Sequence, residues 1–395
     1  MPAKILEGIR VVDLTWVLAG PYATRIFADW GAEVIKVQCG RTAHGAEDNV
    51  RGYFQTWNRN KKSITLNLNY PAARELLLKL IAASDLVIEN FSPRVMSNWR
   101  LTYQDLQKVK RDVIMLSMSA AGQAGPGKDW VAFAPTLQAL SGFTFLTSFA
   151  ADSPLGLGIP YGDVISALYA AFAALAALEY RERTGQGQYI DLSEYEALCS
   201  LLGPALLDGL ANGRKIMPKG NGPDDLPAAP HGCFQCLGTD RWCVIAVFGD
   251  EEWHALCKVM GRPAWAESET LSTMAGRREK AAELEARIEE WTAQKTPEEV
   301  VQLLQDAGVA AGLVQNAEDL ALDPHLLARK FFRPLPHPIY PDALADASPI
   351  QIDGERAGAW KAAPSLGEHN RYVFLNLLGL TEEEFSAYVE QGVIG

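Results

Sequence analysis

The chain has 395 residues, of which 48% are hydrophobic and 21% charged, as is ordinary for a globular protein with a sizeable core. Its length predicts about two to three domains. The formal net charge of −12 argues against general nucleic-acid binding, because nucleic-acid-binding proteins present a basic face. No apolar segment typical of a secretory signal lies near the N-terminus, so we expect a cytoplasmic protein that does not bind a membrane.

Apolar runs alternate with helical patterns over the first third of the chain. The first unit has an apolar run, a turn, a helical pattern at 22–30 and a second apolar run. Such a strand–helix–strand unit predicts a parallel sheet. Its repetition predicts a doubly wound α/β domain. Strands are expected at 9–14, 33–37, 64–68, 86–88 and 113–118.

The loops that follow these strands are the expected walls of a ligand site. In doubly wound sheets, ligands bind at the carboxyl ends of the strands. The first of these loops, WVLAGPYA, has one glycine where a dinucleotide fingerprint needs three, which argues against a nicotinamide-dependent oxidoreductase. The polar segment at 39–60 is expected to be a long loop, and long loops are often functional.

Asp163 precedes a helical pattern that continues unbroken from 164 to 183. The apolar run at 164–178 is shorter than the roughly 20 residues of a membrane span, so we expect a helix buried in a large protein. Asp is a preferred N-cap, and a helix cap is one interpretation of Asp163. The other is a nucleophilic carboxylate, kept ionised by the helix dipole and placed beside a glycine that lets a ligand approach.

The composition changes after residue 211. Glycine and proline are frequent over 212–230, which predicts a linker. Residues 231–329 have the pattern of a separate α+β unit, with a strand pair near 233–248 and several charged amphipathic helices. Two further short helices are expected in the last part of the chain, which begins near residue 330.

Four potential metal ligands lie close together in the second half of the sequence: His231, Cys233, Cys236 and Cys243. The Cys233–Cys236 spacing suits zinc, but no second C-x-x-C pair follows. Cys236 and Cys243 also flank a strand-like apolar run, where buried cysteine is common. We therefore favour reduced thiols over a zinc site and predict no bound metal.

Several segments together resemble the class III CoA-transferases, the family that contains formyl-CoA transferase, carnitine CoA-transferase and the α-methylacyl-CoA racemases. These segments are spread over nearly the whole chain, and together they are highly specific. They are GIRVVDLTWVLAGP (8–21), GAEVIKV (31–37), NRNKKSITLNL (58–68), DLVIENFSP (85–93), SAAGQAGP (119–126), GD (162–163), RERTGQGQYIDLS (181–193) and APSLGEH (363–369).

The resemblance implies two chains interlinked like rings. Each has a Rossmann-like large domain, built from both ends of the chain, and a smaller α+β domain from the middle. We therefore expect a large CoA-binding domain over 1–211, a linker at 212–230, a small domain over 231–329 and a C-terminal part, 330–395, that returns to the large domain. The implied partners are an acyl-CoA, a carboxylic acid, and a second copy or a related subunit. Coenzyme A enters as substrate, and no permanently bound cofactor is expected.

The resemblance also places Asp163 at the family's nucleophile position. There the carboxylate attacks the donor thioester and forms a mixed anhydride, which CoA converts to an aspartyl-CoA thioester. The acceptor acid attacks that thioester, and a second anhydride delivers the acyl group to CoA. Such covalent catalysis transfers the acyl group without exposing it to water.

Matching the family's CoA contacts gives residues in three loops. An arginine of the family pattern falls on Asn98 here, with Arg94 and Arg100 beside it as alternatives, and the acidic-Pro pair after the second strand is Gln38-Cys39. For Arg94, Arg100 and the lysines of the NKKS stretch, the other interpretation is solvated surface charge. The expected CoA contacts are Leu18, Ala19, Leu66, Asn69, Asn90, Phe91, Ser92 and Arg94.

Two features of known branches of this family are absent from the sequence, and their absence narrows the choice of branch. The racemase branch uses a histidine base, and the matching position is Phe133. The glycine-run loop of formyl-CoA:oxalate enzymes is also missing, which favours transferases of larger acids, such as carnitine-like, dicarboxylic or aryl-substituted acids. The PHGCF and DRWCVIAVF stretches resemble the benzylsuccinate CoA-transferase branch. The alternatives are a racemase-like isomerase and a non-catalytic subunit of a heteromeric transferase.

Overall fold

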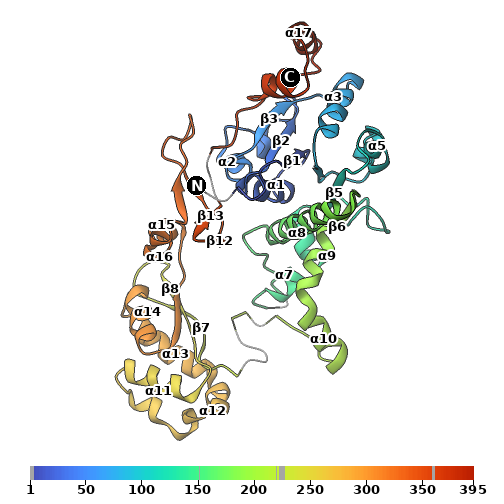
Figure 1. The fold of residues 1–395 in the computed structure, drawn as a ribbon. Helices are drawn as coiled ribbons and strands as arrows, with labels where there is room; N and C mark the ends of the chain where they lie inside the picture. The colour runs from blue at the N-terminus through green and yellow to red at the C-terminus, as the bar shows by residue number, and fades with distance from the viewer. Residues whose placement is uncertain (1–3, 151, 219, 222–226, 358–360) are drawn as a thin grey trace. The chain divides into compact units, whose positions relative to one another are not determined.

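Figure 1 shows the fold in a computed structural model, which describes residues 4–150, 152–218, 220–221, 227–357 and 361–395. The chain forms two compact units and passes between them more than once. Unit 1 comprises Met1–Thr144, Gly156–Arg214 and Pro324–Gly395, and unit 2 comprises Phe145–Leu155 and Lys215–Asp323. Part of the linker expected at 212–230 lies outside the described residues, and the domain limits expected from the sequence stay a prediction.

Unit 1 is built on a six-stranded parallel sheet in the order β3-β2-β1-β4-β5-β6. This is the strand order of a doubly wound fold, so the predicted α/β class is confirmed. The order reverses between β1 and β4, where such folds open a crevice at the carboxyl ends of the strands. The strands are β1 (Arg10–Asp13), β2 (Glu33–Gln38), β3 (Lys62–Thr65), β4 (Leu86–Glu89), β5 (Ile114–Ser119) and β6 (Tyr189–Ser193).

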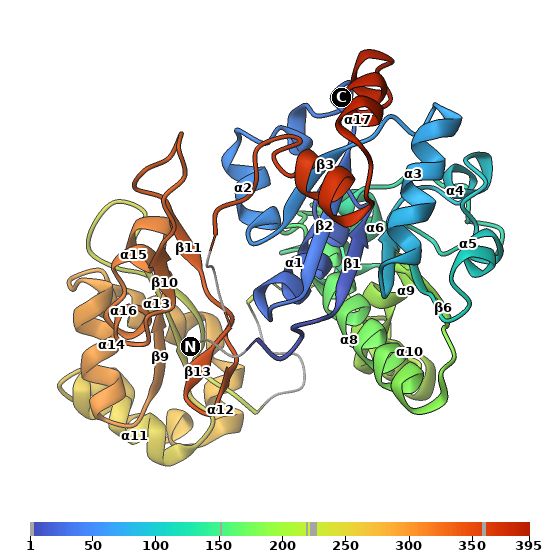
Figure 2. The same cartoon turned by 45° about the horizontal axis from the view of Figure 1, so that its top comes forward.

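Side chains alternate between the two faces of this sheet, and each face has its own core. Val12 and Ile35 pack into one core, beneath α3 (Pro71–Ala82), α5 (Tyr103–Val109) and the C-terminal helices, a π-helix at Tyr372–Leu377 and α17 (Glu382–Glu390). Val11 and Val34 pack into the other core, beneath α1 (Ala19–Asp29) and α8 (Tyr161–Thr184). Figure 2 shows the C-terminal helices beside β3 and α3.

The last residues of the chain complete the first of these cores. Val373, Phe374, Val393 and Ile394 are buried in it. The backbone of this C-terminal segment is also bound to the segment after β3, because the Asn67 N–H donates to the Val393 carbonyl at 3.0 Å. The two ends of unit 1 therefore share one hydrophobic core.

Helix α8 differs from its expected burial. Its alanines pack against α1 and the sheet, but its opposite face is exposed, with Phe172 74% accessible. By length and composition alone α8 could cross a membrane, as many core helices of soluble proteins could. The expected burial is therefore found on one face only, because Leu168, Tyr169, Phe172 and Leu175 on the other face are exposed among the residues that the structure describes.

The segment after β6 is divided into α9 (Glu194–Cys199), a 3₁₀ turn and α10 (Gly203–Asn212), because a Gly-Pro pair starts the last helix anew. One further expectation needs correction. The segment at 39–60 is not all loop, since it contains α2 (Gly52–Asn58). The smaller elements of unit 1 are α4 (Arg94–Asn98), α6 (Ala134–Leu140), α16 (Pro324–Ala328), β10 (Phe332–Pro334), β11 (Leu344–Asp346), β12 (Gln351–Ile352) and β13 (Glu355–Arg356), while α7 (Phe143–Leu146) lies at its boundary with unit 2.

Unit 2 has an antiparallel sheet in the order β7-β8-β9, packed against helices. The predicted strand pair is present, and β9 adds a strand from 65 residues later in the chain than β8, counting from Ile245 to Ala310. Cys236, Cys243 and Cys257 lie in its hydrophobic core, and burial raises the pKa of each thiol. The described residues hold no group of three or more metal-ligating side chains. The elements are β7 (His231–Gln235), β8 (Trp242–Ala246), α11 (Asp250–Val259), α12 (Met274–Glu279), α13 (Ala281–Thr292), α14 (Pro297–Asp306), β9 (Ala310–Leu313) and α15 (Ala317–Leu322).

A buried ion pair lies at the carboxyl end of β1. The Lys61 ammonium is 2.9 Å from Asp13 Oδ2, and both side chains are fully buried. Lys61 also donates to Thr24 Oγ1 and Asn58 Oδ1, while Asp13 accepts from the Thr15 N–H and hydroxyl. Burial alone would raise the pKa of Asp13, but Lys61, Lys36 and Thr15 together lower it to about 2. Lys61 is therefore a structural cation and not a solvated surface charge.

Replacing Lys61 tests this pair. Lys61→Met removes the nearest cation and leaves the Asp13 carboxylate poorly compensated inside the fold. We expect the free energy of unfolding to fall by about 3–5 kcal/mol. Lys62→Met is the matched control, since Lys62 pairs with Glu33 on a partly exposed surface and should change stability by about 1 kcal/mol or less. Urea unfolding followed by circular dichroism measures both losses, and equal losses would contradict the argument.

Candidate functional site

A cavity of about 230 Å³ lies at the carboxyl ends of β1, β4, β5 and β6. Its walls come from the loops that follow these strands and from the first turn of α8. This is the position at which doubly wound folds bind ligands. The lining residues are Trp16, Val17, Leu18, Ala19, Asn90, Phe91, Ser92, Pro93, Ser119, Ala120, Lys128, Trp130, Val131, Ala132, Phe133, Ala134, Asp163 and Glu194.

Six of the nine site residues expected from the sequence line this cavity: Leu18, Ala19, Asn90, Phe91, Ser92 and Asp163. Three do not. Leu66 is 1% exposed and belongs to a core, and Asn69 follows it on the surface. Both come after β3, which β2 and β1 separate from β4 in the sheet. Arg94 is largely exposed, with its Nε 4.0 Å from Asp129. The CoA contacts proposed for these residues stay a prediction.

The loop between β1 and α1 is held on two sides. Asn90 Oδ1 accepts from the Trp16 N–H at 2.9 Å, and Asn90 Nδ2 donates to the Trp16 carbonyl at 3.0 Å. The Val17 N–H donates to Glu47 Oε1 at 2.9 Å, and Glu47 pairs with the buried Lys36 at 3.1 Å. These bonds hold Val17 at a φ of 66°, which is unfavourable for a β-branched residue. The cavity wall is therefore fixed before any ligand binds.

Asp163 is the third residue of α8, which begins at Tyr161 with Pro160 at the N-cap position. The interpretation of Asp163 as the N-cap is therefore wrong, because the turn at Pro160 starts the helix earlier. The side chain is 9% exposed and lies on the cavity wall. Burial raises its pKa to about 6, although its own backbone N–H lowers it. At neutral pH it is an ionised carboxylate that is more basic than usual.

Glu194 is a second buried carboxyl on the same wall, and sequence reasoning missed it. It is the first residue of α9, directly after β6, and it is 8% exposed. Burial and then the charge of Asp163 raise its pKa to about 8. In the sequence it is one of two acidic residues in a first helical turn, where the helix dipole is the ordinary explanation. Its place after the sixth strand is the one signal that could have found it.

A glycine brings these two carboxyls to one cavity. A Cβ on Gly162 would lie 2.9 Å from Leu198 Cδ1, which is closer than real Cβ atoms come. A side chain at residue 162 would therefore force Leu198 on α9 to move. This close packing sets the distance at which Asp163 raises the pKa of Glu194.

Tyr53 on α2 is a further polar group near Asp163. Burial, then the charges of Asp163 and Glu47, raise the pKa of its hydroxyl to about 12, so it stays protonated. Its ring packs edge-on against Trp57, with centroids 6.3 Å apart, and Trp57 packs against Tyr22. The sequence analysis missed Tyr53 because it assigned this segment to a loop. The four-residue spacing of Tyr53 and Trp57 is the helical signal that was available.

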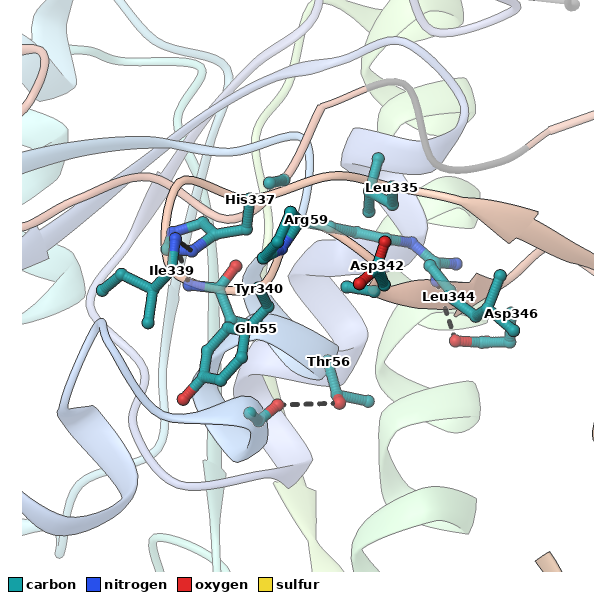
Figure 3. Close-up of a pocket in the computed structure, with 15 residues that line it drawn as sticks. Gln55, Thr56, Arg59, Leu335, His337, Ile339, Tyr340, Asp342, Leu344 and Asp346 are labelled. Atoms are coloured by element: carbon teal, nitrogen blue, oxygen red, sulfur yellow. Dashed lines mark hydrogen bonds and ion pairs between the residues drawn. The ribbon is translucent and has the colours of Figure 1, made fainter. Parts of the chain in front are cut away.

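Two other cavities among the described residues are weaker candidates. One of about 550 Å³ contains Arg59, whose guanidinium is bound by Asp29 at 2.6 Å and by Asp346 at 2.8 Å, and Figure 3 shows Arg59 and Asp346 on its wall. Its charge is neutralised, so it is not available to a ligand anion. The other, of about 680 Å³ on unit 2, is lined mostly by apolar residues and glycines around His231. The cavity with two buried carboxyls is therefore the candidate site.

Comparison with known proteins shows the family to which the chain belongs. The model of CoA-transferase family III matches residues 6–370. The chain is 32% identical to a succinyl-CoA–D-citramalate CoA-transferase from Chloroflexus aurantiacus, over 100% of this chain and 99% of that protein. It is 34% identical to a succinyl-CoA:mesaconate CoA-transferase from Haloarcula marismortui, over 92% and 94%. A crystal structure of a CAIB/BAIF family protein from Brucella suis superposes with a TM-score of 0.87 and 28% identity, over 95% of this chain and 100% of that one.

Because the pKa of Glu194 is raised, we predict that the free energy of unfolding depends on pH. Between an ordinary pKa of 4.5 and the folded value of about 8, the folded protein holds a proton that the unfolded chain has lost. Stability contributed by Glu194 therefore falls as pH rises through this window. Glu194→Gln removes this loss, so the variant should gain stability relative to wild type as pH rises from 4.5 to 8 and then stay level. Urea unfolding at a series of pH values measures the difference. The exposed neighbour Glu196→Gln should show no such trend, and parallel curves for wild type and Glu194→Gln would contradict the assignment.

Proposed function

Because the chain belongs to CoA-transferase family III, we propose that it moves CoA from an acyl-CoA donor to an organic acid through covalent intermediates on Asp163. Class III CoA-transferase activity follows from the family and from relatives that bear this name. The covalent mechanism and the acid are the proposal. The observation that carries it is the buried carboxylate of Asp163 in the cavity that Leu18, Ala19, Asn90 and Phe91 also line.

Each step of the proposed mechanism uses the Asp163 carboxylate. An oxygen of Asp163 attacks the thioester carbonyl carbon, the carbon–sulfur bond breaks, and CoA leaves as a thiolate. The thiolate attacks the aspartyl carbonyl of the resulting anhydride and releases the first acid. The acceptor carboxylate then displaces CoA from the aspartyl thioester, and the thiolate takes the new acyl group and frees Asp163. Burial supports this role, because a carboxylate with a pKa near 6 is ionised at neutral pH yet more nucleophilic than an ordinary one.

For the acid we propose a small dicarboxylic acid, with succinyl-CoA as a donor. Lys128 lies on the cavity wall, and no ion pair is described for it among the residues of the structure. A second carboxylate on the substrate would find a cation there. The two relatives described above act, by their names, on succinyl-CoA with citramalate or mesaconate. Transfer assays of succinyl-CoA against dicarboxylic, carnitine-like and aryl acids distinguish the classes.

The racemase alternative is less favourable on this geometry. Phe133 lies on the cavity wall at the position of the racemase histidine, and its side chain has no proton acceptor. A non-catalytic subunit would not need a nucleophile, whereas Asp163 is present and faces the cavity. Both arguments favour a catalytic transferase.

We further propose that a second chain covers the exposed side of α8. Leu168, Phe172 and Leu175 on α8 are exposed, and so are the leucines of α10, with Leu210 83% accessible. Apolar residues exposed together in this way are typical of protein–protein interfaces. The interlinked dimer that the family resemblance implies provides such a partner, either a second copy or a related subunit.

Replacing Asp163 tests the nucleophile. Asp163→Asn keeps the size of the side chain but cannot form the acyl linkage, so transfer should fall by several powers of ten, at about 1.4 kcal/mol of barrier for each tenfold. Wild-type enzyme incubated with acyl-CoA alone should gain mass on the peptide that contains Asp163, and hydroxylamine should trap the adduct as a hydroxamate. Glu182→Gln, at an exposed carboxyl near the other end of α8, is the control and should keep its rate. Near-normal transfer by Asp163→Asn, with no adduct on the wild-type peptide, would show the assignment to be wrong.

Sedimentation tests the proposed interface. A charge at Phe172 should prevent an apolar contact across α8, so Phe172→Glu should sediment as a smaller species than wild type at the same concentration. Glu279→Lys, at an exposed position on α12, changes charge equally sharply and should leave the wild-type assembly intact. If Phe172→Glu and wild type sediment alike, the exposed face of α8 is not the interface.

A further inference from the structure

The carboxyl of Glu194 has no function in the mechanism proposed above, although it lines the same cavity as Asp163. It is 8% exposed, and no hydrogen bond to it is described among the residues of the structure. Its oxygens are not among the fully buried side-chain atoms that lack a hydrogen-bond partner, so they border the open space of the cavity. Such a group inside a ligand cavity has its partner supplied when the ligand binds. Glu194 therefore faces the space that the substrate occupies.

The groups around Glu194 leave it uncharged at neutral pH. Burial and the charge of Asp163 raise its pKa, so the two carboxyls together hold one proton, which lies on Glu194. Lys128 is the cation on the cavity wall, and it is exposed to solvent. On β6, Asp191 is already bound by the Gln123 N–H at 3.0 Å. The titratable side chains on the elements packed against Glu194 are Tyr161, Asp163 and Tyr169 in the first half of α8, Tyr189 and Asp191 on β6, and Tyr195, Glu196 and Cys199 on α9 itself, while α6 has none; those in the second half of α8 are Glu179, Tyr180, Arg181, Glu182 and Arg183.

We propose that the protonated carboxyl of Glu194 donates a hydrogen bond to the oxygen on the acyl carbon that reacts with Asp163, and that Glu194 is therefore a second catalytic residue. This inference rests on the proposed function, because it needs Asp163 as the nucleophile. The two carboxyls lie on the walls of one cavity of about 230 Å³, which is small enough for a single acyl group to reach both. The proton stays on Glu194 throughout, so no bond to hydrogen is made or broken in the step.

This hydrogen bond would strengthen as the reaction proceeds. The acceptor oxygen is a thioester carbonyl in the bound donor, an oxyanion after Asp163 attacks, and a carboxylate oxygen when the acid is released. A donor that meets growing negative charge stabilises the transition state more than the bound substrate. A protonated Glu194 also favours binding of the acceptor acid, because this acid arrives as an anion at the aspartyl-CoA thioester. An ionised Glu194 would repel both the acid and the oxyanion, so only the protonated form can act.

Two substitutions of Glu194 test whether the site needs a hydrogen-bond donor and whether this donor must be protonated. Glu194→Gln keeps a neutral hydrogen-bond donor of the same size, whereas Glu194→Leu keeps the volume and removes the donor. Wild-type kcat/KM for the acid should fall as pH rises above about 8. Glu194→Gln should stay within about tenfold of wild type at pH 7 and lose this alkaline decline, while Glu194→Leu should lose about 10²–10³ in kcat, the usual effect of removing an oxyanion donor. Glu196→Gln should keep both the rate and the alkaline decline.

The outcomes separate this inference from the proposed function. The hydroxylamine trap on the wild-type enzyme reports the covalent step at Asp163 by itself. If the adduct forms, but Glu194→Leu is as fast as wild type or Glu194→Gln keeps the alkaline decline, the role of Glu194 is wrong and the nucleophile assignment stands. If no adduct forms on wild-type Asp163, both are overturned. Urea unfolding of each variant shows whether the protein is folded under assay conditions.

Discussion

The buried ion pair between Asp13 and Lys61 is the interaction on which the site depends. It joins the end of β1 to the start of β3, and its hydrogen bonds reach Thr15 and Thr24, on either side of the loop that forms one wall of the cavity. A buried pair of this kind is weak evidence for net stability, because removing two charges from water is expensive. Its value here is geometric. The loop must pass over a fixed charge pattern, and that pattern permits one backbone path.

A second charged pair acts on the same loop from the opposite side. Lys36 is buried and donates to the Thr15 carbonyl at 2.7 Å, while its partner Glu47 holds the strained backbone at Val17. The cations nearest the sheet are thus engaged within the protein, and no described cation lowers the pKa of Asp163 or Glu194, since Lys128 on the same cavity wall is exposed to solvent. This arrangement explains why their pKa values rise while that of Asp13, in the same unit, falls. Burial is common to all three, and the presence or absence of a lysine decides the direction.

The sequence predicts the parts of this protein that depend on local pattern. Alternating apolar runs and helices gave the parallel sheet, and the rule that ligands bind at strand ends placed Leu18, Asn90 and Phe91 correctly on one cavity. Contacts between distant segments were not predictable. The order of strands puts β3 at an edge of the sheet, so Leu66 lies in a core away from the cavity, although its loop also follows a strand. The role of Lys61 was hidden for the same reason, because its partner is 48 residues away. Glu194 was missed because burial, and not residue type, makes it unusual.

The contribution of the C-terminus to the first core has a consequence for how the chain folds during synthesis. The strands of the large sheet leave the ribosome early, but Val373, Phe374, Val393 and Ile394, which pack into the same core, leave only after the whole of unit 2. The intervening unit 2 can complete its own core in the meantime, because all of that core lies between Phe234 and Val309, with α-helical partners close in sequence. The part of this core that Val373, Phe374, Val393 and Ile394 fill therefore stays open until these residues have emerged. Exposed apolar surface of this kind is prone to aggregation, and it is the surface that a chaperone would bind on the nascent chain.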